Sequence, residues 1–262
     1  MVKGVILAGG YGTRLLPCTK ALSKQLLPVY DKPMIYYPLT TLILAGIQEI
    51  LIVCNSDHLT LFKKTLGDGF EFGIHIQYMT QIEPLGIAHG LILAEEFLEN
   101  DKCCLILGDN IFHGPGLGRR LRENRTIEGA KIFAYEVANP QDYGVVAFDV
   151  ENSVTSIEEK PIVPKSNFAI PGLYFMDERC VSFAKDLMPS SRGELEITDV
   201  LLKYMSMQQL LVERLPLGSA WLDTGTVEAL HDASSFVRTL QLRQGIVIGD
   251  PQQASRWLES EQ

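Results

Sequence analysis

Short apolar runs alternate with helix-like stretches along the first two thirds of the chain. The alternating segments cover residues 2–8, 33–46, 49–54, 58–66, 74–79, 86–98 and 102–108. Strands that are buried on both faces read as unbroken apolar runs, whereas strands with one solvated face alternate in polarity. The pattern therefore predicts βαβ units and a mainly parallel sheet flanked by helices.

The pattern changes after residue 130. Short β-rich runs then follow one another with turn signals between them, at 131–137, 143–150, 154–160 and 168–176. Such spacing favours antiparallel strands that are inserted into or beside the sheet. Helices are expected at about 178–188 and 197–207, a β run at 210–217, and a last amphipathic helix at about 226–244. The predicted class is α/β with a mixed central sheet.

Composition limits the classes of partner. The chain has 262 residues, 46% of them apolar, and a formal net charge of −9 at pH 7. It can therefore bury a sizeable core, and its acidic balance argues against a nucleic-acid polymer as partner. Every apolar run is shorter than the roughly 20 residues that a membrane helix needs, and no targeting segment is evident. We expect a cytoplasmic protein with no membrane partner.

Neither cysteine nor histidine forms a recognisable site motif. The five cysteines contain no C-x-x-C pair and lie mostly in apolar runs, so we expect buried free thiols. They are Cys18, Cys54, Cys103, Cys104 and Cys180. The five histidines are scattered, and we expect them to be structural or surface residues: His58, His75, His89, His113 and His231.

A glycine-rich segment follows the first apolar run. Gly9, Gly10 and Gly12 sit where a strand ends, which lets backbone N–H groups approach an anion. The P-loop pattern fails because no Gly-Lys-Ser/Thr follows, and the dinucleotide fingerprint fails because Leu15 replaces its third glycine. The nearby cations, among them Arg14, favour a ligand with more negative charge, such as a triphosphate. A tight turn with surface cations is the alternative interpretation.

Two carboxylates also follow apolar runs. Asp109 comes directly after the run 103–107, and Asp223 follows another apolar stretch. Open α/β sheets bind ligands at the carboxyl ends of their strands. Mg²⁺ is commonly held by one or two carboxylates together with substrate phosphates. The alternative for a lone Asp at such a position is a turn former or a helix cap.

The stretch "LAGGYGTRLLPCTKALSKQLLPVYDKPMIYYPL" resembles the signature of sugar nucleotidyltransferases, most closely the glucose-1-phosphate thymidylyltransferase family. The resemblance extends over about residues 2–245 and implies a Rossmann-like nucleotide-diphospho-sugar transferase fold. It implies catalytic roles for Arg14, Lys24 and Lys160, and Mg²⁺ held by Asp109 and Asp223. It also implies a nucleotide-binding set: Leu7, Gly9, Gly10, Gly12, Thr13, Gln25, Gln81, Pro84 and Gly86.

Further stretches resemble the sugar pocket of that family. "DYGVV", "EEKP", "FAIPGLYFM" and "RGELEITD" contain the implied sugar-binding residues Tyr143, Gly144, Glu159, Gly172, Tyr174 and Glu196. From the residues alone, "EEKP" is a solvated strand end, and the acids of "RGELEITD" interact favourably with a helix dipole. Two differences from the family pattern stand out, Ala147 in place of Glu and Pro171 in place of Thr or Ser. The second borders the implied sugar pocket.

The resemblance implies one nucleotidyltransferase domain at 1–245 and a short tail at 246–262. Its nucleotide-binding half would cover about 1–130, its sugar-binding half about 131–225, and a closing helix 226–245. The implied reaction joins dTTP, or another pyrimidine nucleoside triphosphate such as UTP or CTP, to glucose 1-phosphate or another sugar 1-phosphate. A homo-oligomer is expected. A catalytically silent sensor of nucleotide sugars is the alternative from another class.

Overall fold

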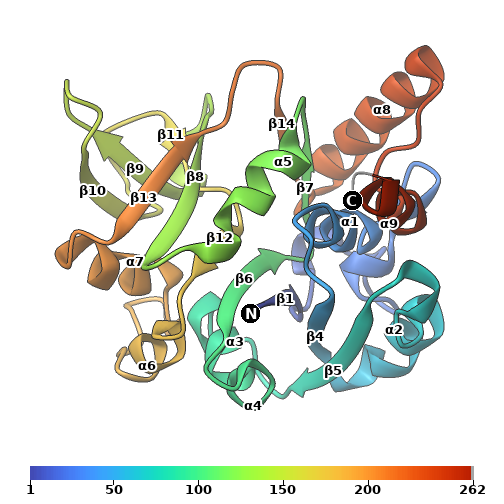
Figure 1. Cartoon of the computed structure of the whole chain (residues 1–262), viewed down its shortest axis with the longest axis horizontal. Helices are drawn as coiled ribbons and strands as arrows, with labels where there is room; N and C mark the ends of the chain where they lie inside the picture. The colour runs from blue at the N-terminus through green and yellow to red at the C-terminus, as the bar shows by residue number, and fades with distance from the viewer. Residues whose placement is uncertain (261–262) are drawn as a thin grey trace. The chain divides into compact units, whose positions relative to one another are not determined.

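The computed structural model describes residues 1–260 (Figure 1). The chain forms two compact units. The first unit comprises Met1–Pro84, Ile106–Arg125 and the chain from Gly218 onward. The second unit comprises Leu85–Leu105 and Thr126–Leu217. These units interleave along the chain, and the predicted division into consecutive halves stays a prediction.

Three parallel strands run through the first unit. They are β1 (Val2–Ala8), β4 (Glu49–Asn55) and β5 (His75–Gln81), with β4 in the middle. The helices α1 (Tyr36–Leu44) and α2 (Leu59–Leu66) lie in the connections before and after β4. The predicted βαβ pattern is confirmed here. Because the strands are parallel and in register, their carboxyl ends, where Ala8, Asn55 and Gln81 lie, meet at one edge.

Smaller elements complete the first unit. Strand β7 (Asn110–His113) pairs antiparallel with β14 (Ala220–Asp223), and β2 (Pro28–Val29) pairs with β3 (Lys32–Pro33). The helices are α5 (Leu117–Arg122), α8 (Val227–Gln244) and α9 (Pro251–Ser260). Short 3-10 helices are η1 (Thr13–Leu15), η2 (Lys24–Leu26), η3 (Ser56–His58) and η4 (Phe70–Phe72).

Helix α9 lies in the segment that the sequence pattern treats as a tail. It packs beside α1, as Figure 1 shows at the dark red end of the chain. Ala254 is buried, the guanidinium of Arg122 lies 5.0 Å from the ring of Trp257, and Ser255 Oγ donates to the carbonyl of Phe72. These contacts join α9 to the rest of the first unit through positions far away in sequence.

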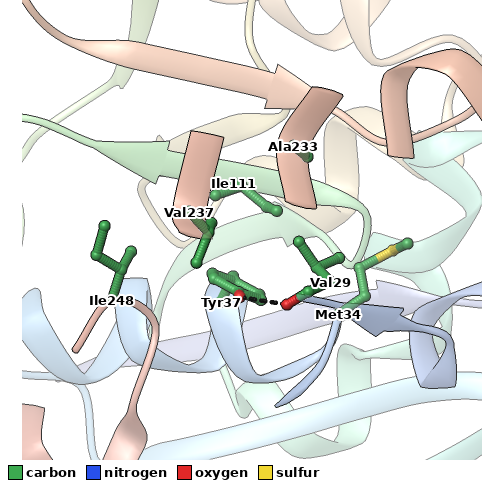
Figure 2. Close-up of a cluster of buried hydrophobic side chains, with 7 residues drawn as sticks. All are labelled: Val29, Met34, Tyr37, Ile111, Ala233, Val237 and Ile248. Atoms are coloured by element: carbon green, nitrogen blue, oxygen red, sulfur yellow. Dashed lines mark hydrogen bonds between the residues drawn. The ribbon is translucent and has the colours of Figure 1, made fainter. Parts of the chain in front are cut away.

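A buried cluster in the first unit supports the elements beyond the parallel strands. Figure 2 shows it between the hairpin β2–β3, β7 and α8, with the hydroxyl of Tyr37 donating to the carbonyl of Val29 at 2.7 Å. The cluster consists of Val29, Met34, Tyr37, Ile111, Ala233, Val237 and Ile248. Met34 Sδ also lies 3.1 Å from Thr224 Oγ1. This core therefore supports the chain directly after β14.

Antiparallel strands dominate the second unit, as predicted. Strand β8 (Ala130–Glu136) pairs antiparallel with β11 (Phe168–Ala169) and β12 (Leu173–Met176), and β9 (Gly144–Phe148) pairs antiparallel with β10 (Val154–Glu159). Strand β13 (Leu210–Arg214) runs parallel to β8. Strand β6 (Lys102–Leu107) leads from the second unit into the first. The mixed α/β class is confirmed.

The helices of the second unit agree with the sequence pattern. They are α3 (Ile87–Leu93), α4 (Glu95–Leu98), α6 (Cys180–Lys185) and α7 (Ile197–Ser206), with 3-10 turns η5 (Glu123–Thr126) and η6 (Pro140–Asp142) nearby in sequence.

All five cysteines are free thiols, and all but Cys18 are buried, as expected. Within residues 1–260, no helix combines the length and the apolar character of a membrane span.

Candidate functional site

The carboxyl edge of the parallel strands brings together Gly9, Gly10, Asn55 and Gln81. The carboxamide of Gln81 lies directly against Gly9, where an added Cβ would fall 1.9 Å from Gln81 Nε2. Asn55 Oδ1 accepts hydrogen bonds from Gly10 N at 3.4 Å and from Gln81 Nε2 at 3.3 Å. A glycine at position 9 is therefore required for this packing, which places Gln81 beside the glycine loop.

The glycine loop has the conformation that its sequence allows. Gly10 and Gly12 have φ values of +134° and +58°, which residues with a Cβ rarely adopt. The carbonyl of Gly12 accepts from Thr19 Oγ1 at 2.8 Å, and an added Cβ on Gly12 would fall 2.9 Å from Thr19 Cγ2. Arg14 follows on η1 with an exposed side chain. The loop thus combines open backbone with a nearby cation.

Lys24 and Asp109 form an ion pair within the first unit. Lys24 is on η2, Asp109 follows β6, and the ammonium contacts Asp109 Oδ2. Asp109 Oδ1 accepts from Asn110 Nδ2 at 3.1 Å. Burial alone would raise the pKa of Asp109, but the Lys24 ammonium and these hydrogen bonds hold that pKa below its ordinary value. Asp109 is therefore a carboxylate, although only 8% of the residue is exposed.

Asp223 lies beside Asp109 through the pairing of β14 with β7. Asp223 is opposite Asn110, and Thr224 donates to the carbonyl of Asp109 from its N–H at 3.1 Å and from its hydroxyl at 2.8 Å. An added Cβ on Gly225 would fall 2.7 Å from Arg14 Nη2 and 3.3 Å from Asp223 Oδ1. The first unit therefore gathers two carboxylates with the cations Arg14 and Lys24.

The donor set fits Mg²⁺ only in part. In the described chain, no group of three or more His, Cys, Asp or Glu side chains could hold a metal ion. Two carboxylates suit a hard cation that takes its remaining ligands from phosphate oxygens and water, whereas they do not form a protein cage. Asp109 and Asp223 are therefore compatible with a Mg²⁺ that arrives with a phosphorylated ligand.

The implied sugar-binding residues cluster in the second unit. Gly144 lies opposite Glu159 in the β9–β10 pair, and an added Cβ on Gly144 would fall 3.4 Å from Glu159 Oε2. Burial and the nearby Glu196 raise the pKa of Glu159, while Arg192 and Lys160 act in the opposite direction. Tyr174, on β12, is buried, and its pKa is raised by burial and by the charge of Glu159.

Lys160 directly follows β10 and has a strained backbone conformation. Its φ of +40° is unusual for a residue with a Cβ, and its N–H donates to the carbonyl of Tyr143 at 3.0 Å. The side chain is exposed, and its charge is close enough to lower the pKa of Glu159. Strained residues of this kind cluster at functional sites, and the role of Lys160 stays a prediction.

Arg192 is a site residue that the sequence pattern did not single out. Its guanidinium contacts Glu159 Oε1 at 3.4 Å, Glu194 Oε2 at 2.7 Å and Glu196 Oε1 at 3.5 Å. Glu196 Oε1 also accepts from Ser190 Oγ at 2.7 Å. The mixed charges of "RGELEITD" indicated that this segment could form ion pairs. Only the fold brings Glu159 close to Arg192.

The remaining predicted residues occupy different environments. Gly86 has a φ of +105°, and an added Cβ would fall 2.4 Å from the carbonyl of Leu195, next to Glu196. Gln25 is buried and its Oε1 accepts from Ser23 Oγ at 2.5 Å. Thr13 and Pro84 are exposed, Leu7 and Tyr143 are half-buried, and Gly172 is buried.

A cavity of about 720 Å³ opens elsewhere in the first unit. It is lined by α1, α5 and α9, including Leu44, Arg122 and Trp257, and by the loop at 246–250. Arg122 Nη1 donates to the carbonyl of Leu44 at 3.1 Å on its wall. None of the predicted site residues lines this cavity, so it is separate from the site described above.

A family model describes the same region of the chain. The model of the nucleotidyl transferase family matches residues 3–239. The chain belongs to the nucleotidyl transferase family. Both groups of predicted site residues, those in the first unit and those in the second, lie within the matched residues.

Two curated relatives of the chain are glucose-1-phosphate thymidylyltransferases. A glucose-1-phosphate thymidylyltransferase of Mycolicibacterium smegmatis is 52% identical over 252 residues, which cover 96% of this chain and 88% of the relative. The protein of that name from Neisseria meningitidis is 54% identical over 248 residues, which cover 94% of this chain and 86% of the relative. The family resemblance that the sequence motifs indicate is confirmed.

Solved structures of the family have the same fold. A candidate glucose-1-phosphate thymidylyltransferase of Bacillus anthracis, solved in complex with sucrose, has a TM-score of 0.84 and 39% identity. The similarity covers 91% of this chain and 96% of that one. A UDP-glucose pyrophosphorylase solved with UDP-glucose has a TM-score of 0.79 at 24% identity, over 91% and 99% of the two chains, and supports the fold alone.

Proposed function

We propose that this nucleotidyltransferase makes dTDP-glucose and pyrophosphate from dTTP and glucose 1-phosphate. The observation that carries the proposal is the group formed by Arg14, Lys24, Asp109 and Asp223 beside the glycine loop. In a chain with a net charge of −9, cations and carboxylates gathered close together suit a metal-bound triphosphate. The names of the relatives support the choice of thymidylyl and glucose groups.

The first unit would bind the nucleotide. The backbone of the glycine loop at 9–12 would donate to the phosphates, and Arg14 would hold the two phosphates that leave as pyrophosphate. Lys24 would exchange its contact with Asp109 for one with a nucleotide phosphate. Gln81 would hydrogen-bond the edge of the base, because its amide lies beside the loop.

The second unit would bind the sugar phosphate. Glu159 and Glu196 would accept hydrogen bonds from sugar hydroxyls, and Gly144 lies opposite Glu159 in the β9–β10 pair. Lys160 would hold the attacking phosphate with its exposed ammonium. Arg192 keeps the glutamates from repelling one another and from repelling an anionic ligand.

Asp109 and Asp223 would hold Mg²⁺ together with the nucleotide phosphates. When bound, the ion would polarise the α-phosphate and neutralise charge that develops on it. No further protein ligand is required, because Mg²⁺ keeps waters and phosphate oxygens in its shell. This assignment is a proposal that rests on the donor chemistry of the two carboxylates.

The reaction needs no protein nucleophile. A phosphate oxygen of glucose 1-phosphate attacks the α-phosphorus of dTTP in line, a new P–O bond forms, and the bond to the bridging oxygen of the β-phosphate breaks. Pyrophosphate leaves with that oxygen, and no proton transfer is needed. Catalysis of this kind consists of positioning two anions and offsetting their charge. Arg14, Lys24 and Lys160 provide the positive charge.

Pyrophosphate release tests the proposal. A grid of nucleoside triphosphates against sugar 1-phosphates, with Mg²⁺ present, should give the highest kcat/KM for dTTP with glucose 1-phosphate. A preference for UTP or CTP, or for another sugar, would correct the substrates, and no turnover in any combination would favour a nucleotide-sugar sensor. Cytoplasmic location and a homo-oligomer stay predictions.

Two variants test the assigned roles. Asp109→Asn and Arg14→Ala should each lower kcat by orders of magnitude, about 10²-fold or more. Asp109→Asn should still fold, because Thr224 bonds the backbone carbonyl of residue 109 and not its side chain. Asp57→Asn, an exposed Asp after β4, is the matched control and should retain turnover. Near-normal pyrophosphate release by the folded Asp109 or Arg14 variant would refute the roles.

A further inference from the structure

Asn55 has no role in the proposed reaction, yet it contacts both the glycine loop and Gln81. It is the last residue of β4, next to the carboxyl end of β5. A single atom, Asn55 Oδ1, accepts from Gly10 N at 3.4 Å and from Gln81 Nε2 at 3.3 Å. Both bonds are long, so each contributes little energy, and their main effect is on orientation.

The backbone N–H of Gly10 determines the orientation of both amides. A main-chain N–H can only donate, so the Asn55 atom that faces it must be the oxygen. The same oxygen faces Gln81, so Gln81 must present its NH₂ group there. If the Gln81 amide turned over, two carbonyl oxygens would face each other at about the same separation, without a proton between them.

The Gln81 amide has little freedom to adopt another position. Only 8% of the residue is exposed, and its carboxamide lies against Gly9 closely enough that an added Cβ would overlap it. With one N–H directed at Asn55, Gln81 still offers Oε1 as an acceptor and its second N–H as a donor. The order of acceptor and donor that a ligand meets is therefore set by Asn55.

Pyrimidine bases differ in the order that they require. Thymine and uracil have a donor at N3 beside an acceptor at O4, whereas cytosine has an acceptor at N3 beside a donor at N4. An amide that could turn over would pair with either edge. An amide held in one orientation pairs with one edge and leaves unpaired groups against the other, which is a strong basis for discrimination.

We propose that Asn55 is a positioning residue that holds the Gln81 amide in the orientation that accepts the N3–H of thymine or uracil and disfavours cytosine. This inference rests on the proposed function, in which Gln81 contacts the base. Asn55 does not touch the base itself. It does not distinguish thymine from uracil, because these bases share the edge that Gln81 reads.

The test compares dTTP, dCTP and dUTP, which differ only in the base. Asn55→Ala should lower the ratio of kcat/KM for dTTP over dCTP by about tenfold or more, through the KM for the nucleotide. The ratio of dTTP over dUTP and the KM for glucose 1-phosphate should not change. Asn55→Asp keeps an acceptor oxygen in the same place and should restore most of the discrimination. Ser56→Ala, an exposed neighbour, should leave all ratios as in the wild type.

A double-mutant cycle shows whether Asn55 acts through Gln81. In a Gln81→Ala background, Asn55→Ala should cause no further loss of discrimination. Should Asn55→Ala fail to fold, Asn55→Ser, whose hydroxyl is too short to reach Gln81, replaces it. An unchanged ratio of dTTP over dCTP in the folded Asn55 variant would overturn the proposal. So would a further fall in that ratio when Asn55→Ala is added to the Gln81→Ala background.

Calorimetric binding of dTTP and dCTP provides a readout without turnover. If the wild-type protein binds dTTP more tightly than dCTP but releases no pyrophosphate, the proposed function fails. The affinities of the Asn55 variants for dTTP and dCTP then still decide whether Asn55 positions Gln81. If the wild type turns over dTTP and dCTP with equal efficiency, the proposed reaction stands and the role of Asn55 is refuted.

Discussion

Lys24 and Asp109 contact each other across 85 positions of the chain, and the Lys24 ammonium covers Oδ2 of a carboxylate that we assign to Mg²⁺. Oδ1 of the same carboxylate already accepts from Asn110. A cation that binds Asp109 must therefore compete with the positive charge of Lys24. A nucleotide phosphate would provide the ammonium with a new partner.

We therefore expect the protein to bind a divalent cation weakly until a nucleotide is present. Titration with Mn²⁺, followed by electron paramagnetic resonance, should show weak binding to the free protein and about tenfold or tighter binding once dTTP is added. Lys24→Met should bind Mn²⁺ more tightly than the wild type without nucleotide, because Asp109 Oδ2 is then uncovered. Lys20→Met, an exposed cation of the same loop, is the control. Equal Mn²⁺ affinity in the wild type and the Lys24 variant would contradict this prediction.

Lys160 should combine backbone strain with an essential charge. Its φ of +40° costs a residue with a Cβ about 1 kcal/mol, which glycine does not incur. Lys160→Gly should therefore be more stable than Lys160→Ala by about 0.5–1 kcal/mol, as measured by urea unfolding. Both variants should lose most of their turnover, because both lack the ammonium. A Lys160→Gly protein that keeps wild-type turnover would show that the strained position serves no catalytic purpose.

Arg192 should affect the sugar substrate more than the nucleotide. Glu159 and Glu196 share the guanidinium of Arg192, which Arg192→Gln removes. This variant should therefore raise the KM for glucose 1-phosphate by about tenfold. The KM for dTTP should change little. Lys185→Gln, which removes an exposed ion pair with Glu95, is a control on the same unit. Equal effects on both KM values would argue for a structural role of Arg192.

The pH dependence of the KM for glucose 1-phosphate should follow the protonation of Glu159. Burial and Glu196 raise the pKa of Glu159, and Arg192 opposes them. The carboxylate that accepts from sugar hydroxyls is lost as pH falls through this raised pKa, so the KM for glucose 1-phosphate should rise at acidic pH. In Arg192→Gln the pKa of Glu159 should be higher still, and the rise should begin at a higher pH. Identical profiles in the two proteins would contradict the assignment.

Asp177 should stabilise the second unit at neutral pH. Burial alone would raise its pKa, but hydrogen bonds from Arg179, Tyr204 and the N–H of Gly129 hold the pKa below its ordinary value of 3.8. A lowered pKa stabilises the folded state above pH 3.8, and this contribution is lost as pH falls through the lower, folded-state pKa. Asp177→Asn should cost about 1–3 kcal/mol at pH 7 and progressively less below pH 3.8.

Thermal or urea unfolding across pH measures this difference. Asp186→Asn is the control, because Asp186 pairs with Lys203 at 3.1 Å with a side chain that is 71% exposed, and such pairs contribute little. A stability difference between the wild type and Asp177→Asn that stays constant down to pH 2 would contradict the argument.

The local pattern of apolar and polar residues was sufficient to predict the parallel strands and the residues that directly follow them. Val2–Ala8 and Glu49–Asn55 are apolar runs bounded by turn residues, and Asp109 follows such a run. Gly9 and Gly10 were recognisable because their position after a strand allows a loop that a Cβ would obstruct. The family resemblance then connected these positions with Lys160 and Glu159.

Other features depended on contacts between distant segments. Strand β7 is only four residues long and becomes a strand by pairing with β14, more than a hundred positions later, and α9 packs on α1 from the opposite end of the chain. The roles of Asn55 and Arg192 follow from the atoms that they contact, Gln81 in one case and Glu159 in the other. The sequence by itself determined which residues could form strands, loops and charges, because those properties are local. The tertiary structure alone decided which of them share a hydrogen bond or an ion pair, because such bonds require atoms within about 3.5 Å and sequence separation does not specify that distance.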